Sequence, residues 1–510
     1  MNRPNFMRRT ALRAGKSFPF HAARERAARS PPRRKKPFSL RLPIHAPSFP
    51  RIDMGEGGEA MRGKGAFLRG AAVLMGGTLL LRLSGILFRS YICLRIGDAG
   101  MGLYQLIFSL FALAVTACTS GLGLAVTRLA AEGGGALGTL RRCVLLALSA
   151  SLLAGGALWA GSEPLALSVL GSELAVRPLR ILACGLPFMA CCACLKGWFL
   201  AEQRPGIPTA ADVLEQAVSI GAGLALLNSL PPLEALMLGS TLGEAASFTL
   251  TGLCFLRCAR GRKRGTPAPL RGILRIAVPV VSSSFTRSGL SSLENLLVPR
   301  GFRLHGADLA DSLSQYGRMQ AVAMPVILFP AALVTSMCQL LIPKLAFAAS
   351  RGDKETIRNT AGRAIRFTLA FSFFITTLLI VFADPLCRFF FQSAEAGNLL
   401  RIMAPIVPLM YVDSVVDGML KGLDQQLFAF RCNLADSLLR VAAVAVLLPL
   451  WGMAGYAAVL FFSEIFNASL SIYRLLRVTE LDADPVTWVL LPAVGAALLY
   501  YLLVLLSFVG

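Results

Sequence analysis

The sequence is poor in charge. Only 15% of its 510 residues are Asp, Glu, Lys or Arg, whereas a soluble domain carries about 25%. Long apolar stretches take the place of that charge, and 55% of the residues are hydrophobic. This balance excludes an ordinary soluble domain and predicts a protein of the membrane class.

The sequence also lacks catalytic signatures. It contains no Walker A motif, no H-E-x-x-H and no G-x-S-x-G, which are typical of nucleotide hydrolysis, zinc proteolysis and acyl transfer. Histidine occurs only as His21, His45 and His305, and the twelve cysteines have neither metal-ligand nor disulfide spacing. We therefore expect no catalytic residue, no metal and no cofactor, and we expect that the protein is not an enzyme.

Acidic residues are scarce, so the formal net charge is +23. Residues 1–60 hold 14 Lys and Arg against 4 Asp and Glu, and most of the remaining excess falls in short loops between apolar segments. That distribution excludes a single basic face for nucleic acid. Residues 1–60 are predicted to be a disordered basic N-terminal extension. Three interpretations stay open: a start placed too early, with the native chain beginning near Met61, an arm that binds anionic lipids, or a targeting peptide.

The apolar stretches predict an all-α integral membrane protein with about thirteen transmembrane helices, since one crossing needs about 20 apolar residues. Lys and Arg are abundant in every second loop and sparse in the loops between, so the N-terminus and the even-numbered loops are predicted to be cytoplasmic. The expected spans are 68–92, 101–127, 143–162, 178–200, 208–230, 234–256, 273–298, 318–342, 364–383, 399–420, 428–450, 453–473 and 487–508.

A repeat divides these spans. The segments LRIL, PFM, KG and ADVL between 179 and 214 recur as LRIM, PLM, KG and ADSL between 400 and 438. Because six spans separate the copies, both run in the same direction, which is a parallel repeat. The sequence therefore predicts two six-helix lobes, 61–260 and 261–480, and an additional transmembrane helix in 481–510.

Charged residues inside the spans indicate where a substrate would bind. A central Arg costs about 2.5–3.5 kcal/mol on insertion scales and should face a polar cavity or a partner. Arg82 and Arg89 lie two turns apart on one helix, and Arg287 and Glu294 repeat that spacing in the equivalent helix, beside Asn295. These five residues are the predicted substrate-binding set. A structural ion pair for Arg82, and snorkelling of Arg89 to the interface, stay open.

Two acids form a second candidate site. Asp413 and Asp417 are four residues apart, so they share one helix face. One interpretation is a proton or cation site that couples transport to an ion gradient. The other is structural pairing with Arg or with backbone groups of neighbouring helices.

Several motifs resemble one family. Residues 97–106 (GDAGMGLYQL), 120–129 (SGLGLAVTRL), 196–199 (KGWF), 297–300 (LVPR) and 341–344 (LIPK) resemble the stage V sporulation protein B group. That group belongs to the polysaccharide flippases of the multidrug/oligosaccharidyl-lipid/polysaccharide exporter superfamily. The resemblance covers about residues 61–508. Members often carry fourteen helices, whereas thirteen are found here.

The resemblance implies a flippase that moves a lipid-linked oligosaccharide, or a peptidoglycan or spore-cortex precursor, across the bacterial cytoplasmic membrane by alternating access. Arg82 and Arg89 are then expected to hold the pyrophosphate, because Arg donates paired hydrogen bonds to phosphate oxygens. The expected partners are the lipid-linked sugar pyrophosphate, membrane lipids and a coupling ion. Two alternatives stay open: a cation-coupled multidrug exporter that relies on Asp413 and Asp417, and a non-transporting membrane scaffold.

Overall fold

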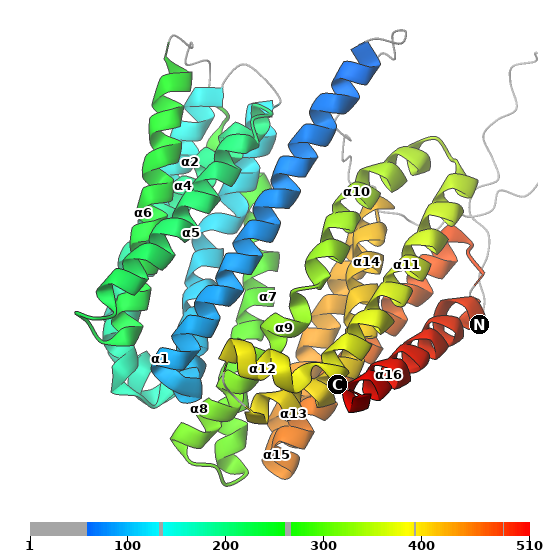
Figure 1. Ribbon diagram of the computed structural model, residues 1–510. Coiled ribbons are helices and arrows are strands. Elements are labelled where there is room, and N and C mark those ends of the chain that lie inside the picture. Colours follow the sequence, from blue (N-terminus) through cyan, green and yellow to red (C-terminus); the bar gives the residue numbers. More distant parts are fainter. Residues whose placement is uncertain (1–58, 132–135, 261–266, 392–393, 483, 510) are drawn as a thin grey trace, which may run out of the picture. The chain divides into compact units, whose positions relative to one another are not determined.

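The computed structural model describes residues 59–131, 136–260, 267–391, 394–482 and 484–509. The chain divides into two units, Met1–Arg62 and Gly63–Gly510, and the second holds nearly all of the described residues. Every regular element in them is a helix, so the all-α prediction is confirmed (Figure 1). The predicted basic extension, 1–60, lies almost entirely outside the described residues.

Two long helices are interrupted by a glycine. Helix α1 (Glu59–Ala131) breaks at Gly97, where φ is 69° and ψ is 176°. Helix α15 (Gln426–Thr479) breaks at Gly452, where φ is 55° and a Cβ would lie 2.7 Å from the His305 ring. Only glycine adopts such backbone angles without strain. The breaks fall between the spans that the sequence predicts on either side of them.

The other predicted spans coincide with single helices or with short runs of them. The single helices between residues 136 and 304 are α2 (Ala136–Ala160), α4 (Val176–Ala201), α5 (Gly206–Leu226), α6 (Pro232–Ala259) and α7 (Leu270–Leu304). The helices and short helical segments after α7, apart from α15, are α8 (Leu309–Gly317), η3 (Arg318–Ala323), α9 (Met324–Leu328), α10 (Ala331–Ser350), α11 (Lys354–Val381), α12 (Ala383–Phe391), α13 (Ala394–Met403), η4 (Ala404–Ile406), α14 (Val407–Gly422), η5 (Val486–Leu490) and α16 (Leu491–Val509). Short turns α3 (Ser162–Pro164), η1 (Leu165–Leu170) and η2 (Glu173–Ala175) connect α2 to α4.

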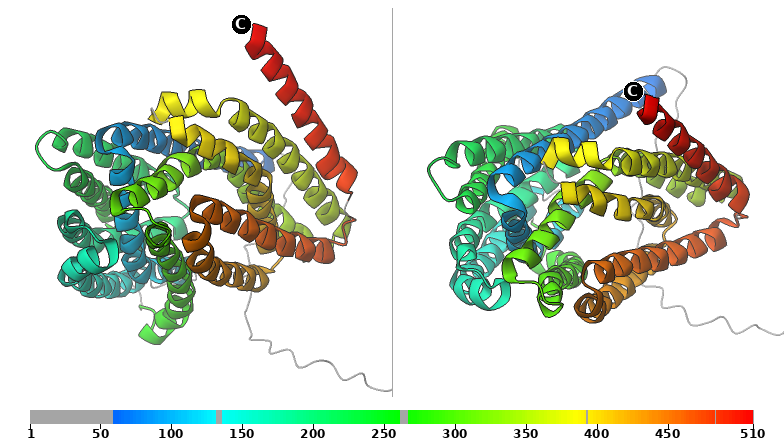
Figure 2. Two further views of the ribbon diagram at one scale, coloured as in Figure 1. Left: turned by 90° about the horizontal axis from the view of Figure 1, so that it is seen from below. Right: turned by 60° about the horizontal axis from the view of Figure 1, so that its bottom comes forward.

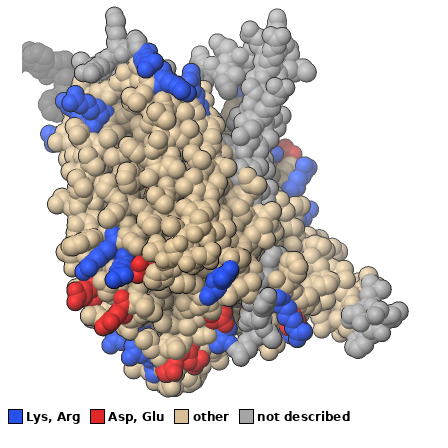
Figure 3. Space-filling model, turned by 60° about the vertical axis from the view of Figure 1, so that its left-hand side comes forward, with Lys and Arg blue, Asp and Glu red and all other residues tan. Residues whose placement is uncertain are grey.

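Eight helical stretches of the described chain are long and apolar enough to cross a membrane. Two of them, 48 and 54 residues long, contain the breaks at Gly97 and Gly452, and each is long enough for two crossings. The count of thirteen therefore stays a prediction. On the face shown in Figure 3, Lys, Arg, Asp and Glu gather towards the two ends and leave a broad belt almost free of charge between them. Such a belt is what the hydrocarbon core of a bilayer requires.

The helices pack in two sets. In the first, α4 packs against α2 and α6, and α6 packs against α5. In the second, α14 packs against α10, α11 and α15, while α7 packs against α15. Helix α16 contacts α11 and extends past its neighbours (Figure 2), and almost none of its apolar stretch is buried. We expect lipid to cover the rest of that helix.

A line of small and polar residues joins the part of α1 after Gly97 to α7 and α8. A Cβ at Gly102 would collide with the carbonyl oxygen of Leu313, and one at Gly317 with that of Asp98. Further along, the Ser292 hydroxyl donates to the Ser109 carbonyl at 2.8 Å. These small side chains let the helix backbones approach closely, as is usual between helices in membranes. We call this contact line the α1–α7/α8 seam.

Candidate transport cavity

A cavity of about 720 Å³ lies among α1, α5, α9, α10, α14 and α15. Its polar lining comes from helices far apart in the sequence: Arg89 from α1, Gln216 from α5, Thr335 from α10, Asp413, Ser414 and Asp417 from α14, and Glu464 from α15. Apolar residues such as Leu328, Phe329 and Met410 complete the wall. A pocket of this size with a few convergent polar groups is the usual form of a ligand site.

Arg89 is the predicted substrate-binding residue that reaches this cavity. No hydrogen bond or ion pair to its guanidinium is found among the described residues, so its donors remain available to a ligand. The Gln216 side chain donates to the Leu81 carbonyl at 2.9 Å and lies close to Gly85. This contact fixes the segment of α1 that carries Arg89. The side chain of Arg82 lies outside the described residues, although its backbone belongs to α1.

Asp413 and Asp417 both line the cavity but have different surroundings. Asp413 Oδ2 accepts a hydrogen bond of 2.9 Å from the Asn467 amide. Its Oδ1 is buried without a partner among the described residues, as is the Oδ1 of Asn467. Asp417 forms an ion pair of 2.6 Å with Lys421. Two neighbouring acceptors without donors can hold a proton or a small cation, whereas Asp417 already has a cation beside it.

Arg287 lies at a smaller cavity of about 300 Å³, which it lines together with Asp417, Lys421 and Asn433. Asp417 borders both cavities, so the cavity that Arg89 lines and the cavity that Arg287 lines share one acidic wall residue. Arg287 is exposed on α7. Its cation is therefore available to a ligand in this second space.

Glu294 and Asn295 make contacts within the protein. Glu294 Oε1 accepts two hydrogen bonds from Arg440, at 2.7 and 3.2 Å, and the Glu294 side chain is only 10% exposed. The Asn295 amide donates to the Ser109 hydroxyl at 3.1 Å, in the α1–α7/α8 seam. Neither residue is among the described residues that line the two cavities. A role for them in binding substrate stays a prediction.

A partly buried charge cluster lies among the helices of the first set. Lys196 on α4 donates to Asp212 at 2.6 Å and to Glu215 at 3.2 Å, both on α5. Glu244 on α6 is 9% exposed and faces the same group of charges. The repeat predicts an equivalent arrangement for Lys421 and Asp436, but there Lys421 pairs with Asp417 and Asp436 accepts from Ser463 at 2.6 Å. The two copies of the repeat therefore keep the residue types and not the pairing.

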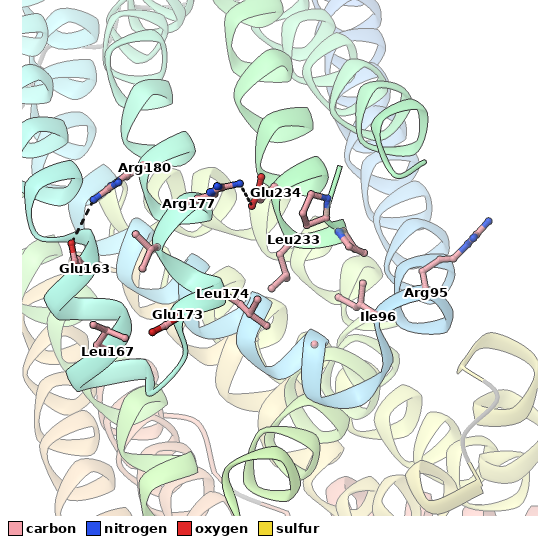
Figure 4. A pocket seen from close by; sticks show the side chains of 14 residues that line it. Arg95, Ile96, Glu163, Leu167, Glu173, Leu174, Arg177, Arg180, Leu233 and Glu234 are labelled. Atoms are coloured by element: carbon pink, nitrogen blue, oxygen red, sulfur yellow. Dashed lines mark ion pairs between the residues drawn. The ribbon is translucent and has the colours of Figure 1, made fainter. Parts of the chain in front are cut away.

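A third cavity, of about 890 Å³, lies where α3, η2, α4 and α6 meet the end of the first part of α1 (Figure 4). Its charges are largely matched: Arg177 pairs with Glu234 at 3.7 Å, and Arg180 lies 3.9 Å from Glu163. Arg95 extends away from these pairs and donates to the Tyr91 hydroxyl at 3.0 Å. Because acids offset most of its cations, this cavity is a poorer site for an anion than the one at Arg89.

A bundle of apolar helices around a polar cavity defines a membrane transporter of the flippase and exporter class. The family model described as polysaccharide biosynthesis protein matches residues 67–300, and the MatE model matches residues 310–447. These two matches support a flippase of the multidrug/oligosaccharidyl-lipid/polysaccharide exporter superfamily, and the chain is a multi-pass protein of the bacterial cell membrane. The resemblance predicted from the sequence motifs is thereby confirmed.

Individual relatives agree with this assignment. The chain is 25% identical to stage V sporulation protein B of Bacillus subtilis (strain 168) over 418 residues, which cover 77% of this chain and 80% of that protein. An uncharacterized membrane protein of the same organism, YabM, is 20% identical over 84% of both chains.

Solved structures share the fold. The lipid II flippase MurJ in an inward closed conformation matches with a TM-score of 0.65 at 15% identity, covering 86% of this chain and 99% of that one. An inward-facing multidrug resistance MATE family transporter matches with a TM-score of 0.62 at 15% identity, over 80% and 96%.

Proposed function

We propose that this protein is a flippase that moves a lipid-linked oligosaccharide, or a peptidoglycan or spore-cortex precursor, across the bacterial cytoplasmic membrane by alternating access. The observation that carries the proposal is Arg89, a cation without a protein partner among the described residues, in the wall of a cavity of about 720 Å³. A pyrophosphate needs such donors. The similarity to stage V sporulation protein B supports the choice of cargo.

In this proposal the chain forms two six-helix lobes, 61–260 and 261–480, with an additional helix in 481–510 and the N-terminus in the cytoplasm. Arg82 and Arg89 hold the pyrophosphate, and Arg287 contacts the headgroup from the adjoining cavity. Asp413 binds a coupling proton or cation through the buried oxygens that it and Asn467 present. Glu294 and Asn295 complete the predicted substrate-binding set, and in the described structure they also hold α7 through Arg440 and Ser109.

The test is flipping by the purified protein in vesicles, followed with a fluorescent lipid-linked sugar pyrophosphate. Arg89→Ala and Arg82→Ala should each abolish flipping while the protein stays inserted. Arg95→Ala is the matched control, because Arg95 lies on the same helix, does not line the proposed transport cavities and has its hydrogen bond with Tyr91. Full flipping by both Arg89→Ala and Arg82→Ala would overturn the flippase assignment and favour the non-transporting membrane scaffold.

One observation favours a second candidate. The described lining of the main cavity holds Asp413, Asp417 and Glu464 against the single cation Arg89. That balance suits a cation-coupled multidrug exporter that takes cationic drugs. Ion-driven drug efflux that is lost in Asp413→Asn and kept in Arg89→Ala would support the exporter and contradict the flippase.

A further inference from the structure

A separate pocket of about 420 Å³ lies between α10 and α11, away from the residues that line the transport cavities. Its polar lining is Lys344, Thr356, Asn359, Thr360 and Arg363, and its apolar lining is Met337, Leu341, Ala364 and Phe367. No acidic residue is among the described residues of this lining. The pocket therefore combines cations and hydrogen-bonding side chains with an apolar wall.

Three neighbouring basic residues are engaged elsewhere. Lys354 pairs with Glu480 at 2.6 Å, and Arg358 pairs with Asp482 at 2.9 Å. Arg351 stacks on the Phe347 ring, 4.1 Å from its centroid. Lys344 and Arg363, in contrast, have neither a hydrogen bond nor an ion pair among the described residues. Lys344 and Arg363 are thus two cations that line the pocket without a protein partner among the described residues.

The apolar wall belongs to membrane-crossing helices. Phe367 is 56% exposed on α11, and Leu341 is partly exposed on α10; both helices are long and apolar enough to span the bilayer. Lys344 follows the apolar stretch of α10, and Arg363 precedes the apolar stretch of α11. Both therefore lie in the halves of these helices that the connection between α10 and α11 joins. A ligand that fits must carry negative charge at the level of Lys344 and Arg363 and an apolar part beside Phe367.

We propose that this pocket is a binding site for an anionic phospholipid, with the phosphate held by Lys344 and Arg363 and an acyl chain lying against Phe367 and Leu341. Thr356, Asn359 and Thr360 supply further hydrogen bonds to the headgroup. Basic pockets between membrane helices are suited to anionic lipid headgroups. The site is distinct from the proposed transport cavity, so the lipid is a bound partner and not the cargo.

The experiment is native mass spectrometry of the full chain released from detergent with either phosphatidylglycerol or phosphatidylcholine. The wild type should retain phosphatidylglycerol preferentially. Lys344→Gln with Arg363→Gln should weaken that binding by roughly 10- to 30-fold. The matched control is Lys354→Gln with Arg358→Gln, which removes the same charge from the same region at two ion-paired positions. An equal loss in both double variants would mean general attraction between charges and would overturn the site.

Three further experiments test the charge requirement, the apolar wall and the source of the phosphate. Lys344→Arg with Arg363→Lys keeps both charges and should keep the preference, which guards against loss through misfolding. Phe367→Ser should weaken lipid binding, because it removes the apolar wall. Soluble glycerol phosphate should not compete at concentrations that leave the protein folded. Effective competition by it would show a site for free phosphate and would overturn the lipid assignment.

Discussion

Arg440 on α15 donates two hydrogen bonds to a single oxygen of Glu294 on α7, at 2.7 and 3.2 Å. The pair joins two helices that pack closely within the second set. Both side chains are mostly buried, with 24% and 10% of their surfaces exposed. Removing one partner of a buried pair costs more than removing both, because the remaining charge has no compensation.

We therefore expect Glu294→Gln to destabilise the protein by about 3–5 kcal/mol and Arg440→Gln to do the same. The double variant should recover part of this loss. Thermal unfolding in detergent, followed by tryptophan fluorescence, measures all three. A Glu294→Gln protein with an unchanged unfolding temperature and no flipping would instead assign Glu294 to the substrate.

The charge cluster at Lys196 should be sensitive to loss of its cation. Lys196→Met leaves the carboxylates of Asp212, Glu215 and Glu244 close together, so their mutual repulsion should lower the unfolding temperature at neutral pH. Lys421→Met is the matched substitution in the second copy of the repeat, where only Asp417 is paired, and its effect should be smaller. Equal effects of the two substitutions would contradict this account.

The start of α11 should depend on Asp353. Its side chain accepts a hydrogen bond from the Thr356 N–H at 2.9 Å. The Thr356 hydroxyl first, and this N–H second, lower the pKa of the Asp353 carboxyl. Because the folded-state pKa is depressed, the stabilisation is present above the ordinary Asp pKa and is lost as the pH falls through the lowered value. Hydrogen exchange at residues 354–358 should accelerate in Asp353→Ala and stay near normal in Asp353→Asn, which keeps the cap. Equal exchange in both variants would rule out the cap.

The α1–α7/α8 seam should be intolerant of added volume. Gly102→Ala places a methyl group against the Leu313 carbonyl, so α1 and α8 must separate, at a cost of about 1–3 kcal/mol. Gly156→Ala is the control, since nothing lies within 4 Å of its added Cβ. The unfolding temperature should fall only for Gly102→Ala. If flipping requires this seam to close, the same variant should also lose flipping, which the vesicle assay measures separately.

The sequence predicted the helices well and their contacts poorly. Apolar length marks each span, and the span boundaries enclose Gly97 and Gly452, where the long helices break. Periodicity placed Asp413 and Asp417 on one face, and both line the same cavity. It could not predict that Arg440 forms an ion pair with Glu294. Nor could it predict that Gln216 contacts α1 or that Asn467 contacts Asp413. A helix face can be derived from spacing, whereas the neighbour it meets depends on the packing of the whole bundle.

The backbone break at Gly97 has a mechanical consequence for Arg89. Arg89 is eight residues before the break, which is about 12 Å along the helix at 1.5 Å per residue. A swing of about 20° about this one glycine moves the base of the Arg89 side chain by about 4 Å, with little change in the rest of α1. That displacement is enough to make or break contact between a guanidinium and an acid across the cavity. The segment of α1 before Gly97 can thus move the single described cation of the cavity towards its acids or away from them, without rearranging the seam beyond the break.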